Sequence, residues 1–231
     1  MARVKSYDKL PINTGIVLDL PHREGVGVKT FDISRSKINM DFVAAPAWTP
    51  LASRLKALTY DGLNDYLECP AADSVALNFT SEDFTLLAWC YVDLAATTSD
   101  MIMCQSEVDV CGWEFYAYHD TLSINLRCNQ LGSRTGIGAA GCYAKGEWFL
   151  AGVTRKGNTG QFYVNGLPVT TLGTLLDPVS AAGGQRLLIG RQWTDSNHWK
   201  GMMRHHRAWV RDIGAGAMAS IWAAEHAAHG V

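Results

Sequence analysis

An antiparallel all-β fold, either a sandwich or a barrel, is predicted by two features of the 231-residue sequence. Short runs rich in β-branched, aromatic and aliphatic residues recur along the chain, and turn-forming residues separate them. No helical pattern of ten residues lies between these runs, which argues against alternating strands and helices. The expected strands are Gly15–Leu20, Ile38–Phe42, Leu55–Tyr60, Asp65–Cys69, Phe84–Val92, Met101–Gln105, Trp113–Tyr118, Leu122–Arg127, Trp148–Thr154, Gln161–Val164, Leu187–Gly190 and Met202–Val210.

Two of these runs have the pattern of central strands. Alternate residues of Phe84–Val92 face opposite sides of a sheet, and both sets are apolar. The run Trp148–Thr154 has the same property. A strand with two apolar faces must be covered on both sides, so we expect both runs in the middle of a buried sheet.

Two dipeptides mark tight turns. Asn165-Gly166 lies between two apolar runs, and both of its positions favour positive φ, which makes it the strongest hairpin signal in the chain. Asp61-Gly62 is a similar but weaker hairpin signal.

One helix is expected in the alanine-rich tail, at about residues 214–228. Met218, Ile221 and Trp222 follow the i, i+3, i+4 spacing and predict an apolar stripe that packs on the sheets. No repeat, linker or change of composition divides the chain. We therefore expect a polar N-terminal arm over residues 1–14 and one sandwich domain over 15–231 that includes the helix.

Composition and charge exclude several classes of protein. A net charge of −2 argues against a nucleic-acid binder, and the absence of any run of about 20 apolar residues argues against a membrane span. The first 20 residues carry charges and lack the apolar region of a signal peptide, so we expect synthesis in a cytoplasm. Only 18% of residues are charged, against about 25% in an ordinary soluble domain, which suggests that a partner covers part of the surface.

The six cysteines show no CxxC pair, which argues against a zinc ribbon. A domain of this size folds without disulfides, and a cytoplasmic chain keeps its thiols reduced, so we expect free thiols. If a pair is bridged, Cys104 with Cys111 or Cys128 with Cys142 is the best candidate, since each pair could flank a hairpin. No cofactor is expected.

Several motifs resemble those of laminin-G-like, concanavalin A-like jelly rolls. The segment Leu58–Leu67, which reads LTYDGLNDYL, resembles the opening of that family, and Asp83–Trp89 is similar to its Phe-Thr-Trp strand. The resemblance runs from about Gly15 to Trp222 and implies a two-sheet jelly roll that binds ligands through rim loops or a concave face, more often than it catalyses. The other motifs, in family order, are Gly146–Trp148, Phe162–Gly166, Leu188–Gly190, Lys200-Gly201 and Arg207–Trp209.

The chain departs from the catalytic and metal-binding members of that family. Some glycoside hydrolases with this fold carry three carboxylates at i, i+2 and i+4 of one strand. Here Glu107 and Asp109 are followed by Cys111 in the third position. We therefore expect a turn without catalytic residues. Calcium prefers six to eight oxygen ligands, and the loop of residues 191–198 offers one carboxylate, Asp195, so no metal is expected.

The loop of residues 192–199 is the best candidate for ligand binding. Tryptophans flank short polar side chains there, a combination that suits sugars, whose apolar ring faces stack on indoles while their hydroxyls form hydrogen bonds. The alternative is an ordinary loop in which Trp199 belongs to the core. The candidate binding residues are Trp193, Asp195, Asn197 and His198.

The last expected strand carries Arg204, His205, His206 and Arg207 in succession. Strand alternation would point these polar side chains to both faces. A sandwich tolerates this only if one face meets water or a partner, so the four residues form a candidate interface.

These observations favour a non-enzymatic structural or adhesive module that self-associates, as in a bacteriophage virion surface or appendage protein. Glycan binding is an additional expectation, and we expect the protein in the virion after synthesis in the host cytoplasm. The alternative is a stand-alone soluble lectin that stays cytoplasmic. A glycoside hydrolase is a third and weaker hypothesis.

Overall fold

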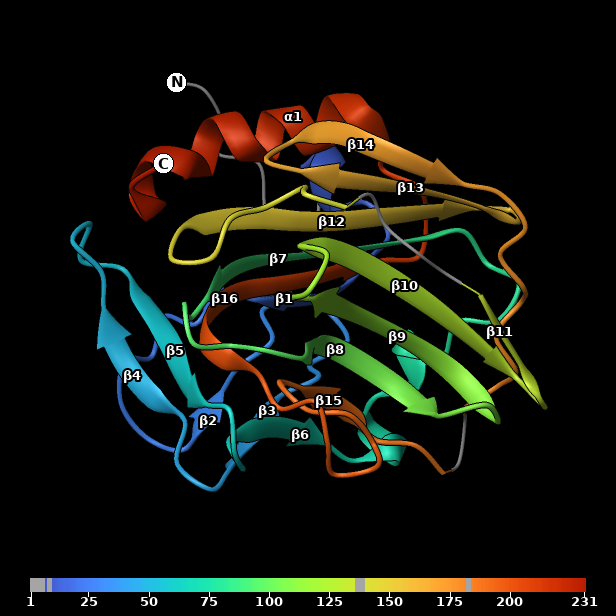
Figure 1. Ribbon diagram of the computed structural model, residues 1–231, viewed down its shortest axis with the longest axis horizontal. Coiled ribbons are helices and arrows are strands. Elements are labelled where there is room, and N and C mark those ends of the chain that lie inside the picture. The colour runs from blue at the N-terminus through green and yellow to red at the C-terminus, as the bar shows by residue number, and fades with distance from the viewer. Residues whose placement is uncertain (1–6, 8–9, 136–139, 182–183) are drawn as a thin grey trace.

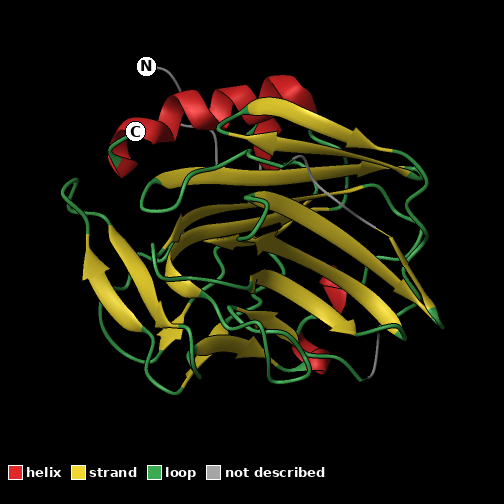
Figure 2. Cartoon of the chain, viewed as in Figure 1, coloured by secondary structure: helices red, strands yellow, loops and turns green. Residues whose placement is uncertain are grey.

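The computed structural model describes residues 7, 10–135, 140–181 and 184–231. Two antiparallel sheets of eight strands each stack as a sandwich, and one helix covers the outside of the first sheet (Figures 1 and 2). The first sheet has the order β14 (Leu167–Leu172), β13 (Thr159–Val164), β12 (Trp148–Lys156), β7 (Phe84–Val92), β16 (Lys200–Trp209), β5 (Lys56–Asp61) and β4 (Ala47–Pro50), with β1 (Ile16–Leu20) also paired to β16. The second sheet has the order β11 (Ser133–Thr135), β10 (Ser123–Gln130), β9 (Cys111–Tyr118), β8 (Ser99–Glu107), β15 (Leu187–Ile189), β6 (Tyr66–Cys69), β3 (Met40–Val43) and β2 (Lys29–Thr30). The all-β prediction is confirmed.

Strands β7 and β12 lie side by side in the middle of the first sheet, as predicted. Leu86 and Val153 face the second sheet and join the core between the sheets. Leu87 and Leu150 face the other way and join a separate cluster beneath the helix. The central strands are therefore covered on both faces.

The predicted C-terminal helix is α1 (Gly214–Glu225), and a short 3₁₀ turn (His226–His229) continues it. Met218 and Ile221 are buried against the first sheet, and Trp222 packs beside them. No helix in the described part of the chain is long and apolar enough to cross a membrane. The remaining helical elements are 3₁₀ turns at Pro11–Asn13, Ala71–Asp73 and Val75–Leu77.

Only one of the two turn predictions is correct. Asn165-Gly166, with φ of 53° and 76°, joins β13 to β14 as a hairpin. Asp61-Gly62 instead links β5 of the first sheet to β6 of the second. Its conformation follows from the Asp61 carboxylate, which accepts the backbone N–H of Leu63 at 2.8 Å and of Asn64 at 3.1 Å. A side-chain-capped turn of this kind supports a change of sheet as readily as a hairpin.

A β-bulge at His205 divides β16 into two halves. His205 has φ of 54°, and the pairing with β7 shifts register between Arg204 and Arg207. Before the bulge β16 pairs with β5, and after it with β1. The extra residue places Arg204 opposite Trp89 and Arg207 opposite Leu87, so both arginines lie on the helix side. The polar side chains still point to both faces, as predicted, because His206 pairs with Leu20 on the core side; the bulge changes which of them share a face.

Gly112 is needed where β9 begins. It has φ of 76°, and an added Cβ would lie 1.8 Å from the Gln105 carbonyl oxygen. Gly132 has a similar φ of 72° with nothing within 4 Å of its Cβ position. We expect Gly132→Ala to lower the free energy of unfolding by about 1 kcal/mol through backbone strain alone, and Gly112→Ala by at least about 3 kcal/mol. Urea unfolding measures both, and equal losses would contradict the close approach of β8 and β9.

All six cysteines are free thiols, and five of them are buried. Burial raises the pKa of Cys69 and of Cys128 to about 12. At pH 8 their thiolate fraction should be about a thousandfold below that of an ordinary cysteine. We therefore expect iodoacetamide to modify these two residues very slowly in the folded chain. In denaturant without reductant, thiol titration should count at least four groups; a count near zero would show disulfides.

Candidate functional site

The loop of residues 191–198, which joins β15 to β16, is held in one shape by Gln192. This side chain is 5% exposed, and its Oε1 accepts hydrogen bonds from Asn197 Nδ2 at 2.6 Å and Ser196 Oγ at 3.1 Å. Its Nε2 donates to Glu114 Oε1 on β9 at 3.0 Å. Glu114 is itself fully buried and accepts a 2.6 Å hydrogen bond from Arg127. The loop is therefore anchored to the second sheet.

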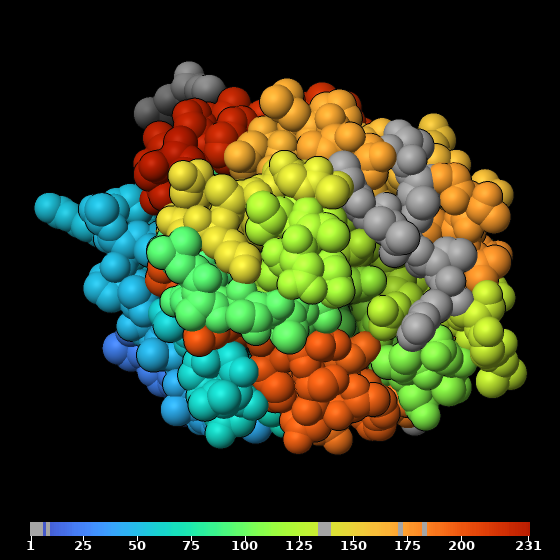
Figure 3. Space-filling view, in the orientation of Figure 1, coloured from blue at the N-terminus to red at the C-terminus, as the bar shows by residue number. Residues whose placement is uncertain are grey.

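A polar cavity of about 250 Å³ lies at the rim of the sandwich beside this loop. Asn197 and His198 line it from the loop, Lys200 from the start of β16 and Asp100 from β8. Figure 3 shows the orange loop in contact with the green segment that forms the opposite wall, residues 95–98. The cavity thus joins segments about 100 residues apart in the sequence.

Some polar side chains of this cavity already have hydrogen-bond or ion-pair partners within the chain, and others do not. Asp100 Oδ2 accepts the Lys200 backbone N–H at 2.9 Å and lies 3.0 Å from His119 Nε2. Within the described chain the Lys200 ammonium has no ion-pair partner, and the buried Nδ1 of His198 has no hydrogen-bond partner. Asp100 is therefore engaged, whereas the Lys200 ammonium can still donate to a ligand. Because His198 Nε2 faces the Asp195 carboxylate, Nδ1 of the neutral ring is an acceptor.

The structure separates the four predicted binding residues. Asn197 and His198 line the cavity, whereas Trp193 and Asp195 do not. Asp195 is exposed and lies 3.0 Å from Arg191 and 3.3 Å from His198. Trp199 is fully buried in the core, as the alternative reading predicted. Asp100, which comes from a distant strand, was not foreseen.

Three of the four predicted interface residues are covered by the chain itself, and the fourth, His205, is half-buried and lines a cavity. Arg204 and Arg207 are each 6% exposed, and His206 is fully buried. Arg207 donates two 2.9 Å hydrogen bonds to Glu225 on α1, and Arg204 Nε donates to the Lys56 carbonyl at 2.9 Å. The partners that these side chains require are supplied by the helix and by neighbouring strands, which corrects the prediction of an exposed docking face.

Part of the N-terminal arm also lies on β16. Trp209 Nε1 donates to the Ile12 carbonyl at 2.7 Å, and Arg211 Nε donates to the Thr14 carbonyl at 2.6 Å. Residues 1–6 and 8–9 of the arm lie outside the described residues.

A buried histidine pair makes the fold sensitive to acid. His206 Nδ1 lies 3.0 Å from His22 Nε2, and burial lowers the pKa of His206 from 6.5 to about 3. The unfolded chain takes up a proton on His206 below pH 6.5, and the folded chain does not, so stability falls as the pH drops through this window. Burial lowers the pKa of His22 in the same direction.

We expect His206 alone to reduce the free energy of unfolding by about 2 kcal/mol between pH 7 and pH 5. Urea titrations at the two pH values measure the loss. The double variant His22→Leu/His206→Leu removes both titrating groups and should reduce the dependence; His205 and His229, whose pKa values burial also lowers, account for what remains. An unchanged slope in that variant would assign the acid sensitivity to other groups.

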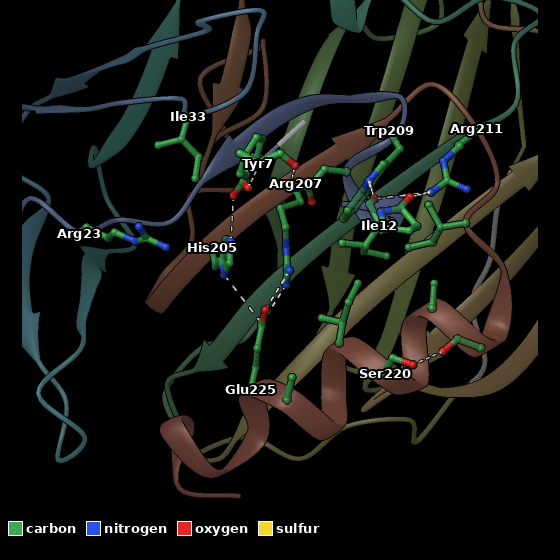
Figure 4. Close-up of a pocket in the computed structure, with 18 residues that line it drawn as sticks. Tyr7, Ile12, Arg23, Ile33, His205, Arg207, Trp209, Arg211, Ser220 and Glu225 are labelled. Carbon is green, nitrogen blue, oxygen red and sulfur yellow. Dashed lines mark hydrogen bonds and ion pairs between the residues drawn. The ribbon is translucent and has the colours of Figure 1, made fainter. Parts of the chain in front are cut away.

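A second and larger cavity, of about 710 Å³, lies between α1 and the first sheet (Figure 4). Its lining includes Asp19, His205, Arg207 and Glu225, together with apolar side chains of the helix. Sequence reasoning did not foresee it, although the basic run of β16 and the helix stripe were both noted. The sequence did not show the bulge in β16, which places His205 and Arg207 on the side of the sheet that α1 covers.

The comparison with protein families agrees with this architecture. The model of the concanavalin A-like lectin/glucanases superfamily matches residues 61–216, more than half of the chain. The chain belongs to this superfamily. No curated protein matches the sequence.

Solved structures with this concanavalin A-like fold include several toxin binding domains. The binding domain of botulinum neurotoxin serotype G is similar with a TM-score of 0.72 and 13% identity over 91% of the chain and 51% of its own length. The binding domain of Paraclostridial Mosquitocidal Protein 1 has a TM-score of 0.70, with 12% identity and coverage of 91% and 52%. A botulinum neurotoxin type C structure has a TM-score of 0.69, with 13% identity and coverage of 92% and 52%. The chain spans about half the length of these structures, and at such identities the similarity establishes the fold alone.

Because the superfamily includes glucanases, the positions of Glu107 and Asp109 decide whether this run could form a catalytic carboxylate set on one strand. Glu107 ends β8, Asp109 lies in the following turn with φ of 58°, and Cys111 begins β9. The run is therefore a turn, as predicted, and does not present three side chains on one strand face. Among the described residues, no group of three or more His, Cys, Asp or Glu side chains is arranged to hold a metal ion.

Proposed function

We propose that this chain is a non-enzymatic glycan-binding module and that the rim cavity holds one sugar residue. The observation that carries the proposal is the convergence of Asn197, His198 and Lys200 in one polar cavity. Together they combine donors, such as the Lys200 ammonium, with acceptors, and a sugar hydroxyl can both donate and accept. The volume of about 250 Å³ is just below the range of roughly 300–1,000 Å³ for drug-sized ligands, which suits a single ring.

The rigidity of the loop supports this proposal. Gln192 holds Asn197 before any ligand arrives, so little side-chain entropy is lost on binding. The similar botulinum neurotoxin type C depends on interaction with two ganglioside molecules for cell entry, which is consistent with glycan binding on this fold.

The charge of the cavity favours an acidic sugar. The Lys200 ammonium has no ion-pair partner among the described side chains, and a carboxylate on the ligand would supply one. We therefore expect sialylated glycans to bind more tightly than their neutral counterparts on a glycan array.

Paired lysine variants test the site. Lys200→Met should weaken binding of a sialylated glycan about tenfold through loss of a charge-assisted hydrogen bond. Lys156→Met removes an exposed lysine that does not line the rim cavity and should leave binding unchanged. Titration calorimetry measures both. Equal effects of the two substitutions, or no glycan bound by the unmodified chain, would refute the assignment.

We further propose that the module is a bacteriophage virion surface or appendage component and that it self-associates. Its support is the low charged fraction of 18%, which suits a subunit packed among neighbours. Co-sedimentation with purified particles, together with an oligomer mass from light scattering, tests both parts. A monomer that stays in the soluble cytoplasmic fraction would favour the alternative of a stand-alone lectin.

A further inference from the structure

The cavity beneath α1 combines an apolar wall with a charged end. Its volume of about 710 Å³ falls within the range of small-molecule sites. Ile12, Trp209, Ile213 and Ile221 line the apolar part. Figure 4 shows His205 and Arg207 directed toward Glu225, with Arg23 beyond His205 and Arg211 at the opposite end. The cavity is separate from the rim cavity, since the two share no lining residue.

Both carboxylates at the charged end are already engaged. Asp19 accepts a hydrogen bond from the Tyr7 hydroxyl, and its Oδ1 lies 2.9 Å from His205 Nε2. Glu225 accepts two hydrogen bonds from Arg207 and a third from Trp89 Nε1 at 2.7 Å. Burial lowers the pKa of His205 well below 6.5, so this side chain is neutral at pH 7. A cationic ligand would find no free acceptor here.

Arg207 pairs with Glu225, but the other two arginines of the cavity, Arg23 and Arg211, keep unused positive charge. Arg23 is exposed and makes no hydrogen bond or ion pair with any described residue. Arg211 donates only to the backbone carbonyls of Thr14, Pro11 and Ile12 within the described chain, so no carboxylate neutralises it. Donors are in excess over acceptors.

We propose that this cavity binds an amphipathic organic anion, with its acidic group at Arg23 and its apolar body along α1 toward Trp209. A carboxylate or sulfonate would supply the acceptor that Arg23 lacks. An apolar chain or ring system would lie against Ile12, Ile33 and Ala217, which line the cavity and are only half-buried, and would remove their remaining apolar surface from water. The inference is independent of glycan binding at the rim.

Three ligands that differ only in the head group test the chemical class. Dodecanoate, dodecan-1-ol and dodecylammonium are titrated into the full chain by calorimetry, below their aggregation concentrations. We expect one dodecanoate per chain, with the alcohol bound about tenfold more weakly and the ammonium more weakly still. Equal affinity of the three, or no saturable binding of dodecanoate, would overturn the proposal.

Two neighbouring alanines on α1 test the location. Ala224 lines the cavity and is exposed, whereas Ala223 is exposed and does not line it. Ala224→Trp should abolish dodecanoate binding, and Ala223→Trp should leave it unchanged, with circular dichroism verifying the fold of each. Arg23→Gln should lower the affinity for dodecanoate to that of the alcohol. Binding that survives Ala224→Trp, or that Arg23→Gln leaves unaltered, would show that the anion binds elsewhere or without Arg23.

Discussion

Strands β7 and β12 are apolar on both faces, and the need to cover them organises the rest of the molecule. The second sheet buries one face, and helix α1 buries the other. The indole N–H of Trp89 on β7 lies in the apolar cluster beneath the helix, where it would cost free energy if it had no hydrogen-bond partner. Glu225 at the end of α1 accepts this hydrogen bond, so a constraint set by β7 also fixes the end of the helix.

The half-buried Glu225 carboxylate in turn pairs with a cation, which β16 supplies through an irregularity. In a regular strand, residues three apart would point to opposite faces. The bulge at His205 puts Arg204 and Arg207 on the same side, where Arg207 pairs with Glu225. Burial tends to raise the pKa of Glu225, but Arg207 and other donors hold it below its usual value. The same bulge lets β16 exchange β5 for β1, and His205 and Arg207 of the bulge line the cavity between helix and sheet.

The two cavities use the fold in different ways. The rim cavity depends on a loop whose shape is fixed by hydrogen bonds to Gln192 and, through it, to Glu114 on the second sheet. The cavity beneath α1 lies between a helix and a sheet, and residues of the bulge in β16 form part of its lining. A sandwich of this family is a rigid scaffold, and its binding chemistry is decided by such local departures from regular structure.

The sequence by itself determined the class of fold, the two central strands, the hairpin at Asn165-Gly166 and the apolar stripe of α1. These features depend on local periodicity, which is visible wherever burial is strong. The strands it missed, β2, β4, β11 and β14, are the outer strands of the two sheets. An edge strand pairs on one side only and lacks a clear apolar alternation, so its sequence carries little signal.

For the rim site, sequence patterns identified Asn197 and His198 because they lie in one short polar loop. They could not identify Asp100, since only the stacking of strands brings β8 beside that loop. Nor could they place Arg204 and Arg207 on one face, because a bulge arises from the pairing of three strands and leaves no periodic signal. Local sequence thus decided which segments form strands and loops, and tertiary packing decided which polar side chains meet.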